Sequence, residues 1–463
     1  MTGEHRGGDG AVRRMGFRIG AEGRASLTAL VRLALPVVVA RLGIQIMGLT
    51  DAVVVGRYSA QQLGYHALGW APTMVVLVSA IGLLNGVQVM TARHVGSGQP
   101  DLAGAVLRRG LVYALWLGIG STALMWFGGP WFLAHIGLDT DLAQGAGRAL
   151  RVFSLSMVPY LLFVAATNFV EGLGRPLSGT VIMWIANAVN LGLNLLFVPG
   201  TLGLPAMGAV GAGWATFGSR TLMAALLIGW IFSRPEARSL GLFHRPVRDR
   251  AAEREQRRIG YGAGASLFVE VGAFSGMNIV AGWLGAQAVA SWAVVLNVTA
   301  IVFMFPMGVA AATAVLVGQA FGAKDHPGLV RSALSGFGLA TVIALVFWLA
   351  VGFGAREIAH GYIQDEALVR MTSGALVLAA LFFVPDALQV VAANALRARG
   401  DVLVPTITHT VSYAVIMLPL GWAMAHPLHM GLSGILWSVV IASFISAGLL
   451  LWRFQRLTAR GDA

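Results

Sequence analysis

The sequence predicts an all-α integral membrane protein whose twelve transmembrane helices form two pseudo-symmetric six-helix bundles. Three observations support this fold class. The 463 residues are 57% hydrophobic and only 11% charged, with a mean hydropathy of +0.75. Apolar runs recur along the whole chain, and several phrases occur twice in the same order. Soluble domains carry about 25% charged residues, so this chain has too few ions to cover a surface that faces water.

The apolar runs define twelve helices, each long enough to cross about 30 Å of hydrocarbon. Each must be helical because lipid offers no partner for an unpaired backbone amide, and the short alternating segments of a membrane β-barrel are absent. The predicted spans are 27–55, 66–92, 104–128, 148–171, 178–199, 207–232, 259–283, 289–318, 329–353, 369–394, 403–425 and 430–453. The predicted domains are an N-terminal segment 1–26, a lobe 27–232, an Arg-rich linker 233–258, a second lobe 259–453 and a tail 454–463.

The basic residues predict which ends of the helices face the cytoplasm. With both termini inside, the start, the linker, the tail and the short inner loops hold most of the 32 Lys and Arg residues, Arg397 and Arg399 among them. The outer loops hold Arg57, Arg148, Arg151, Arg356 and Arg370. This bias follows the positive-inside rule. We therefore expect a multi-pass protein of the bacterial inner membrane with both termini in the cytoplasm.

Composition also excludes several classes of function. The net charge of +12 does not indicate a nucleic-acid partner, because topology and anionic lipid headgroups account for the arginines. Cysteine is absent, which excludes disulfides and Cys-ligated metal. The first apolar run is too long for a signal-peptide core, so no cleavable signal is expected. We predict no cofactor, no metal-dependent catalytic site and a monomer whose partners are the lipid bilayer and a small-molecule substrate.

An internal repeat divides the chain into two halves. "GVQVMTARHVG" begins at Gly86 and "GVAAATAVLVG" begins at Gly308, and six of their eleven positions are identical. Three further pairs occur at nearly the same separation: "GRYSAQQLGYHAL" with "GWLGAQAVASWAV", "VPY" with "VPD", and "MGAVGAGW" with "MGLSGILW". Four collinear matches indicate duplication. Because each half has an even number of spans, both enter the membrane from the same side, and a substrate site between them is expected near mid-depth.

Several phrases resemble the multidrug and toxic compound extrusion family of secondary transporters. They include "LALPVVVARLGIQIMGLTDAVVVGR", "GVQVMTARHVGSGQ", "VEGLGRP", "FVEVGAF", "FPMGVAAATAVLVGQAFGAKD" and "NALRARGDVLVP", and the match extends over about 27–453. The resemblance implies twelve helices in two lobes, and export of organic, cationic or amphipathic compounds in exchange for H⁺ or Na⁺ by alternating access. It further implies coupling acids at Glu270 and Asp386 in the second lobe, while the family's first-helix Asp matches Asp51.

The depths of the two acids agree with a coupling role. Glu270 lies about 16 Å from the inner end of its helix, near mid-bilayer, where a charge is costly. Asp386 is expected at a similar depth, and Pro385 should kink its helix and free a carbonyl as an additional cation ligand. Two carboxyl groups in one low-dielectric cavity favour a shared proton or a bound Na⁺. The alternative is a purely structural hydrogen-bonded pair. Asp51 is either a second cation site or an acid that is hydrogen-bonded to Asn190 or Thr216.

Other intramembrane side chains are candidates for the substrate cavity. Arg41 and Arg220 fall within spans of the first lobe, where each needs a carboxylate, a cluster of carbonyls or an anionic substrate. The remaining candidates are polar or adaptable side chains, for which helix packing is the competing interpretation: Asn190, Asn278, Phe274, Met277, Met304 and Phe305.

Two other functions compete with efflux. A flippase for lipid-linked or anionic substrates would favour basic cavity residues, and Arg41 and Arg220 are the feature that points to it. A polytopic lipid-modifying enzyme would need a nucleophile with its base, or a metal cluster, at one membrane face. Neither arrangement is evident in the sequence, so no enzyme activity is predicted.

Overall fold

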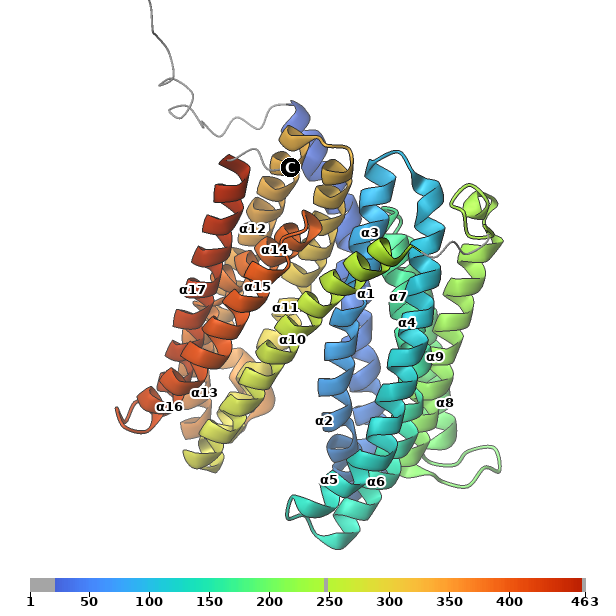
Figure 1. Ribbon diagram of the computed structural model, residues 1–463. Helices are drawn as coiled ribbons and strands as arrows, with labels where there is room; N and C mark the ends of the chain where they lie inside the picture. Colours follow the sequence, from blue (N-terminus) through green and yellow to red (C-terminus); the bar gives the residue numbers. More distant parts are fainter. Residues whose placement is uncertain (1–20, 245–248, 460–463) are drawn as a thin grey trace, which may run out of the picture.

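The computed structural model describes residues 21–244 and 249–459, and every regular element in these ranges is a helix (Figure 1). The first half contains α1 (Ala21–Tyr58), α2 (Ala60–Leu83), α3 (Asn85–Gly96), α4 (Ala103–Ala123), α5 (Gly129–His135), α6 (Thr140–Leu155), α7 (Met157–Gly172), α8 (Leu177–Phe197) and α9 (Gly208–Ser233). The second half contains α10 (Arg250–Trp283), α11 (Ala286–Gly322), α12 (His326–Tyr362), α13 (Glu366–Ala380), α14 (Phe383–Ala398), α15 (Leu403–His409), α16 (Leu418–Ala425) and α17 (Leu432–Ala459).

These helices confirm the predicted fold class. Within the described residues, eleven helices or helix pairs are long and apolar enough to span a membrane, or twelve when the bent pair α13–α14 is taken as one span. Exposed side chains such as Phe127, Trp116 and Phe353 cover their outer faces, as expected for contact with lipid. Several predicted spans are interrupted helices. The predicted span 66–92, for example, is α2 and α3 joined at Leu84.

The predicted kink before Asp386 is confirmed. α13 and α14 meet at an angle of 42° across Leu381 and Phe382. Pro385 then lies in the first turn of α14, where a residue without an N–H is tolerated but cannot continue the preceding helix. A second irregularity is the π-helical segment Thr410–Met417 between α15 and α16. Such wide turns are often found at functional sites.

The linker and the tail differ from their predicted bounds. The linker was expected at 233–258, but α10 begins at Arg250, where the Asp249 side chain accepts a hydrogen bond from the Ala252 amide at 3.0 Å. α17 likewise continues to Ala459, past the predicted end of the lobe. The α10 extension is rich in Arg, Glu and Gln, and the shorter α17 extension contains Gln, Arg, Leu and Ala. These residues are good helix formers, so both helices extend beyond their apolar stretch. Most of the predicted N-terminal segment lies outside the described residues.

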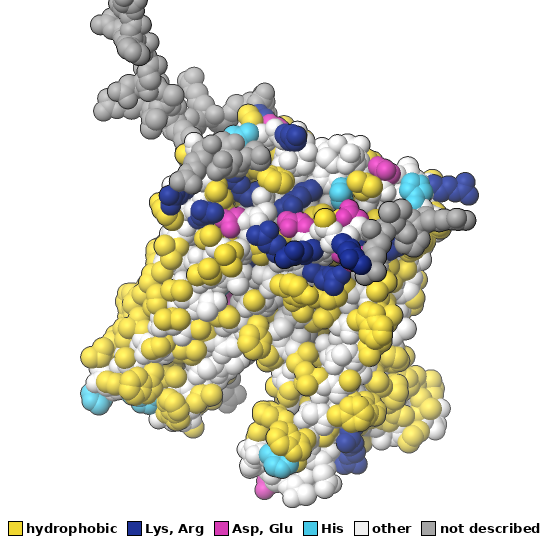
Figure 2. All heavy atoms as spheres, viewed as in Figure 1, with side chains coloured by type: hydrophobic (Ala, Val, Ile, Leu, Met, Phe, Trp, Pro, Cys, Tyr) yellow, Lys and Arg dark blue, Asp and Glu magenta, His cyan; other side chains and the backbone are white. Residues whose placement is uncertain are grey.

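The helices gather into two lobes that touch at one end and diverge at the other (Figure 1). Across this boundary α2 and α3 pack against α10, and α11 packs against both α1 and α3. Figure 2 shows the surface hollowed between the lobes at the diverging end, whereas Lys and Arg side chains gather at the end where the lobes meet. We refer to the latter as the basic end. α1 begins and α17 ends there.

The repeated phrase forms the contact between the lobes. A methyl group added to Gly96 would overlap the Gln319 carbonyl, and one added to Gly308 would overlap Val38. Gly318 lies against Ala92, and Gly86 against the Gln256 carbonyl. Glycine lets two backbones approach this closely because it has no Cβ. Both copies of the repeated phrase therefore lie at the contact between the lobes. Each copy supplies small residues to one side of this pseudo-symmetric junction.

Candidate cation-coupling sites in the two lobes

Glu270 and Asp386 lie inside the C-terminal lobe, on α10 and α14. Their side chains are 8% and 9% exposed, and Asp386 and Arg397 are the charged groups that act electrostatically on Glu270. No ion pair joins either acid to a base within 4 Å in the described ranges. Asp386 accepts a hydrogen bond from Gln389 Nε2 at 3.2 Å, and Gln389 in turn accepts one from Ser446 at 3.3 Å. The sequence therefore predicted correctly that the two acids are buried in one lobe and interact.

Arg397 is a member of this cluster that the sequence analysis missed. It was assigned to a short inner loop, and that assignment is wrong: Arg397 is 5% exposed and lies in the last turn of α14. Its Nη2 donates to Ser266 Oγ at 2.7 Å. Ser266 precedes Glu270 by one turn on α10, so the guanidinium lies on the same face of α10 as Glu270, one turn away, and acts on it electrostatically. Its position next to Arg399 and before a Gly-Asp turn is typical of a solvated loop. Arg397 is buried only in the folded protein, where α14 packs against α11, α12 and α17.

Tyr413 of the π-helical segment lies near the carboxyl pair, together with aromatic and polar side chains from neighbouring helices. Tyr413 has no exposed surface, and its ring lies 6.2 Å from that of Phe274 and 5.9 Å from that of His409. Its hydroxyl interacts electrostatically with Asp386 but does not reach hydrogen-bond geometry. Both ring nitrogens of His409 and the Ser443 hydroxyl also have no hydrogen-bond partner among the described residues. Buried polar groups of this kind commonly bind water or ions.

Asp51 forms a second buried cluster in the N-terminal lobe. It is 2% exposed, and it accepts hydrogen bonds from Asn194 Nδ2 at 2.7 Å and from Thr216 Oγ1 at 2.6 Å. Asn190 is linked to it through Asn194, whose Nδ2 lies 3.2 Å from Asn190 Oδ1. The Asn190 Nδ2 atom has no partner within the described part of the chain. The predicted bond to Thr216 is present, and each carboxylate oxygen of Asp51 accepts a hydrogen bond.

The two intramembrane arginines of this lobe have different surroundings. Arg220 is 3% exposed, donates to Ser156 Oγ at 2.9 Å and lies over the ring of Tyr160 at 4.2 Å. It also interacts electrostatically with Asp51. These contacts position the guanidinium, and its Nε has no hydrogen-bond partner among the described residues. Arg41 is half-buried and makes no hydrogen bond or ion pair within residues 25–244 and 249–459, although it acts electrostatically on Tyr160 and on the buried Glu171.

Glu171 is another buried acid that the sequence analysis did not select. It is 3% exposed and accepts a hydrogen bond from Gln88 at 2.8 Å. Asn168 and Asn394 occupy equivalent positions in the repeat, so Glu171 in one lobe corresponds to Arg397 in the other. Duplication has thus left a buried acid and a buried base at matching positions, each near the end of its helix.

The remaining cavity candidates divide between core and surface. Met277 has no exposed surface and packs against Gly421, so its assignment to a cavity lining is wrong: it fills the gap between α10 and α16. Phe305 is half-buried, with its ring 4.7 Å from Phe347 of α12, and Met304 is also half-buried. Phe274 packs on the lobe core beside Tyr413, whereas Asn278 is exposed on α10. No group of three or more His, Cys, Asp or Glu residues is arranged to hold a metal ion in the described ranges.

Comparison with known proteins relates both halves to one family. The family model MatE matches residues 36–196 and again residues 263–423, which agrees with the duplication read from the sequence. A protein of Caulobacter vibrioides named "Probable multidrug resistance protein NorM" is 57% identical over 434 residues, which cover 94% of this chain and 92% of the relative. A protein of Rhizobium meliloti with the same name is 30% identical over 445 residues, which cover 94% of each chain.

Solved structures support the same fold. One is described as the outward-facing conformation of a multidrug resistance MATE family transporter of the MOP superfamily; it is 21% identical, has a TM-score of 0.86, and the match covers 95% of this chain and 97% of that one. A MOP superfamily transporter from Pyrococcus furiosus, whose description reports a reversed polarity of the binding pocket, is also 21% identical, with a TM-score of 0.84 and coverage of 95% and 97%. At this identity the likeness concerns the fold alone.

Proposed function

The chain belongs to the MatE family of membrane transporters, and on this basis we propose that it exports organic compounds in exchange for H⁺ or Na⁺ by alternating access between its two lobes. The substrates are amphipathic or cationic small molecules, since the bacterial relatives are named multidrug resistance proteins. Family membership makes it a transporter rather than an enzyme. The proposal concerns the direction of transport, the coupling ion and the substrate class.

The observation that carries the proposal is the buried carboxyl pair in one lobe of a molecule that is closed at one end. Glu270 and Asp386 have no basic partner within ion-pair distance in the described residues, and the single charge of Arg397 acts on Glu270. A mobile proton or cation is therefore suited to balance the second carboxyl group. An ion can shift a two-state equilibrium only through its differential affinity for the two states. Binding of a proton or cation to this pair can therefore shift the equilibrium between two conformations of the lobes. One conformation is open at the diverging end and the other is open at the basic end.

The direction of transport follows from the orientation in the membrane. The concentration of Lys and Arg at the end where the lobes meet supports a cytoplasmic location for that end and for both termini (Figure 2). The cleft at the opposite end then opens to the periplasm, the side to which an exporter releases its substrate. A location in the bacterial inner membrane and function as a monomer without nucleic acid complete the proposal.

An efflux assay tests the proposal directly. In a drug-sensitive bacterial host that expresses the chain, ethidium should leave de-energised, preloaded cells when an inward H⁺ or Na⁺ gradient is imposed, and the two gradients are applied separately to identify the coupling ion. Recovery of chemically unmodified ethidium in the medium distinguishes transport from metabolism. If neither gradient accelerates efflux over vector-only cells, and a panel of cationic and zwitterionic dyes gives the same result, exchange-driven export is excluded.

Asp51 provides a separate test of cation coupling in the first lobe. Asp51→Asn should lower gradient-driven efflux at least about tenfold, because the amide can neither take up a proton nor neutralise Na⁺. Thr216→Val keeps the acid but removes its 2.6 Å hydrogen bond, a loss that costs about 1–3 kcal/mol when the partner stays buried. This variant should melt at lower temperature yet retain ion-dependent exchange. If Asp51→Asn exports at the wild-type rate, Asp51 is a structural acid only.

Arg41 favours a second candidate substrate class. Because this half-buried cation makes no hydrogen bond or ion pair to the described residues, an anionic group of a substrate is a suitable partner for it. Uptake of a cationic dye and of an anionic dye into inverted vesicles, each with wild type and with Arg41→Gln, separates the two classes. Arg41-dependent transport of the anionic dye alone would replace the cationic assignment.

A further inference from the structure

Arg93 links the two lobes at the basic end. It belongs to α3 of the N-terminal lobe, yet its guanidinium bonds to the C-terminal lobe. Nε donates to the Ala398 carbonyl at 2.9 Å and Nη2 donates to the Arg397 carbonyl at 3.3 Å. Nη1 lies 3.5 Å from Glu255 Oε1, and the guanidinium carbon lies 4.9 Å from the centre of the Phe321 ring.

The carbonyls that Arg93 binds are those at the end of α14. The last carbonyls of a helix have no partner within the helix and carry partial negative charge, so a cation is favoured there. Two N–H groups of the planar Arg93 guanidinium donate to two consecutive carbonyls, an arrangement that the ammonium group of lysine cannot reproduce. Gly400 has a φ of +98° and turns the chain away from the end of α14. Because glycine has no Cβ, it also leaves space for the guanidinium: a Cβ at this position would lie 3.4 Å from Arg93 Nη2.

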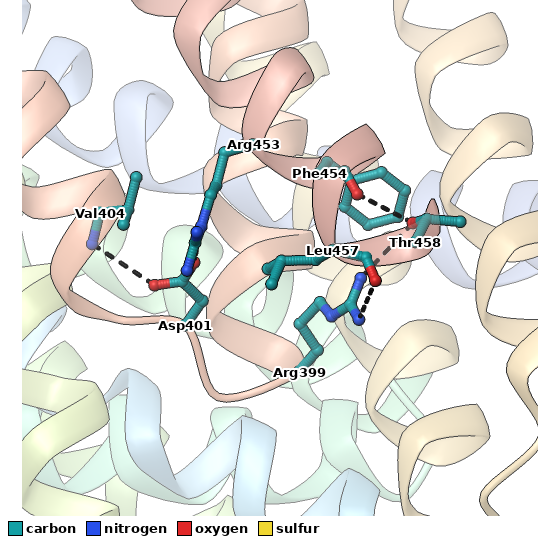
Figure 3. A network of polar contacts seen from close by, with 7 residues as sticks. All are labelled: Arg399, Asp401, Val404, Arg453, Phe454, Leu457 and Thr458. Carbon is teal, nitrogen blue, oxygen red and sulfur yellow. Dashed lines mark hydrogen bonds and ion pairs between the residues drawn. The ribbon is translucent and has the colours of Figure 1, made fainter. Parts of the chain in front are cut away.

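The end of α14 is also fixed within its own lobe. Figure 3 shows the loop after α14 held against α17: Arg453 Nε donates to Asp401 Oδ2 at 2.7 Å, and the Arg399 guanidinium reaches the Leu457 carbonyl and Thr458 Oγ1 at 3.5 Å. The carbonyls that accept from Arg93 therefore belong to a helix end that is fixed by contacts with α17. The same helix carries Asp386 near its start, so a displacement of α14 reaches both the carboxyl pair and Arg93.

The repeat shows that this link exists on one side only. Arg93 occupies the eighth position of the first copy of the repeated phrase, and the second copy has Val315 there. The glycine contacts of the junction are shared by both copies, so Arg93 is an asymmetric addition to a symmetric interface. Its bonds to α14 require the lobes to be in contact at the basic end.

We propose that Arg93 is the latch of the inner gate: by binding the last carbonyls of α14 it stabilises the state closed at the basic end and sets how often that end opens. This role rests on the proposed exchange cycle and makes Arg93 a positioning residue for transport. A latch of this kind responds to movement of α14, the helix that also holds Asp386. Loss of two charge-assisted hydrogen bonds should shift the ratio of closed to open molecules by about tenfold or more.

The absence of cysteine allows this ratio to be measured with site-specific labels. Spin labels on Gln99→Cys in the N-terminal lobe and Ala323→Cys in the C-terminal lobe, both exposed at the basic end, report the separation of the lobes in double electron–electron resonance. Arg93→Ala should increase the long-distance fraction about tenfold, and Arg93→Lys should lie between this variant and wild type. Glu255→Gln should change it little, because that pair is partly exposed.

Arg175→Ala is the matched control, since Arg175 is a half-exposed arginine at the basic end of the same lobe that pairs only with Glu236 among the described residues. It should leave the distance distribution unchanged. The latch is excluded if Arg93→Ala gives the wild-type distribution, or if Arg175→Ala gives the same shift. Should Arg93→Ala fail to fold, as judged by its melting transition, Arg93→Lys decides the question. The distance measurement needs no substrate, so a failure of the wild type to export would overturn the proposed function and leave the latch result intact.

Discussion

Replacing Glu270 by Gln, or Asp386 by Asn, is expected to reduce gradient-driven efflux to the level of cells without the protein. Both substitutions preserve the shape of the side chain but remove the group that binds a proton or balances a cation. The buried pair has no basic partner within 4 Å in the described residues, and Arg397, which acts electrostatically on Glu270, supplies one positive charge for two carboxyl groups. Loss of either acid therefore removes a group that the transported ion would occupy. The measurement is ethidium efflux under an imposed H⁺ or Na⁺ gradient, with the amount of protein in the membrane determined by immunoblot.

Glu366→Gln serves as the control for this prediction. Glu366 is an exposed acid of the same lobe that pairs with Arg356 at 2.6 Å, and exposed pairs contribute about 0–1 kcal/mol, so its variant should export normally. The coupling role fails if both Glu270→Gln and Asp386→Asn retain near-normal exchange. If the variants are present in the membrane in normal amounts but do not export ethidium, the two acids act in coupling and not merely in folding.

Replacing Gly322 by Ala is expected to abolish transport for a different reason. Gly322 ends α11 at the junction, and a Cβ there would overlap the backbone carbonyl of Arg93 in the other lobe. A backbone atom cannot turn aside as a flexible side chain can, so the lobes must separate at the basic end. Overpacking of this kind costs about 1–3 kcal/mol, which corresponds to about a tenfold to hundredfold loss of the closed state. Gly96→Ala, which would overlap the Gln319 carbonyl, should behave in the same way.

Efflux and the melting temperature of the purified protein test this prediction together. Gly120→Ala is the matched control: it is a glycine within α4 with no atom within 4 Å of the added methyl group. It should export normally and melt at the same or a slightly higher temperature, since alanine favours helix by up to about 1 kcal/mol. Normal efflux by both Gly322→Ala and Gly96→Ala would show that the junction does not have to close this tightly.

Part of the coupling site was predictable from local features of the sequence. Glu270 and Asp386 were selected through the family resemblance, and their expected depth within apolar runs agreed with that choice; Pro385 predicted the bend at α14. Arg397 did not stand out, because it follows the apolar run and lies beside Arg399, as a solvated arginine would. Met277 was selected for the wrong reason: its adaptable side chain suits a cavity, but α16 covers it completely.

The sequence by itself determined the membrane environment, the number of spans, the duplication and the two acids of the second lobe. The first three follow from the length of apolar runs and from repeated order, and the two acids follow from the resemblance of their motifs to a known family; all are properties of the chain before it folds. Only the tertiary structure decided that Arg93 binds the end of α14, that Arg397 faces Ser266, and that the repeated glycines meet across the lobes. Each of these contacts joins residues far apart in the chain, and its geometry depends on which faces two helices present to each other, a choice that hydrophobicity alone leaves open when lipid and core are equally apolar.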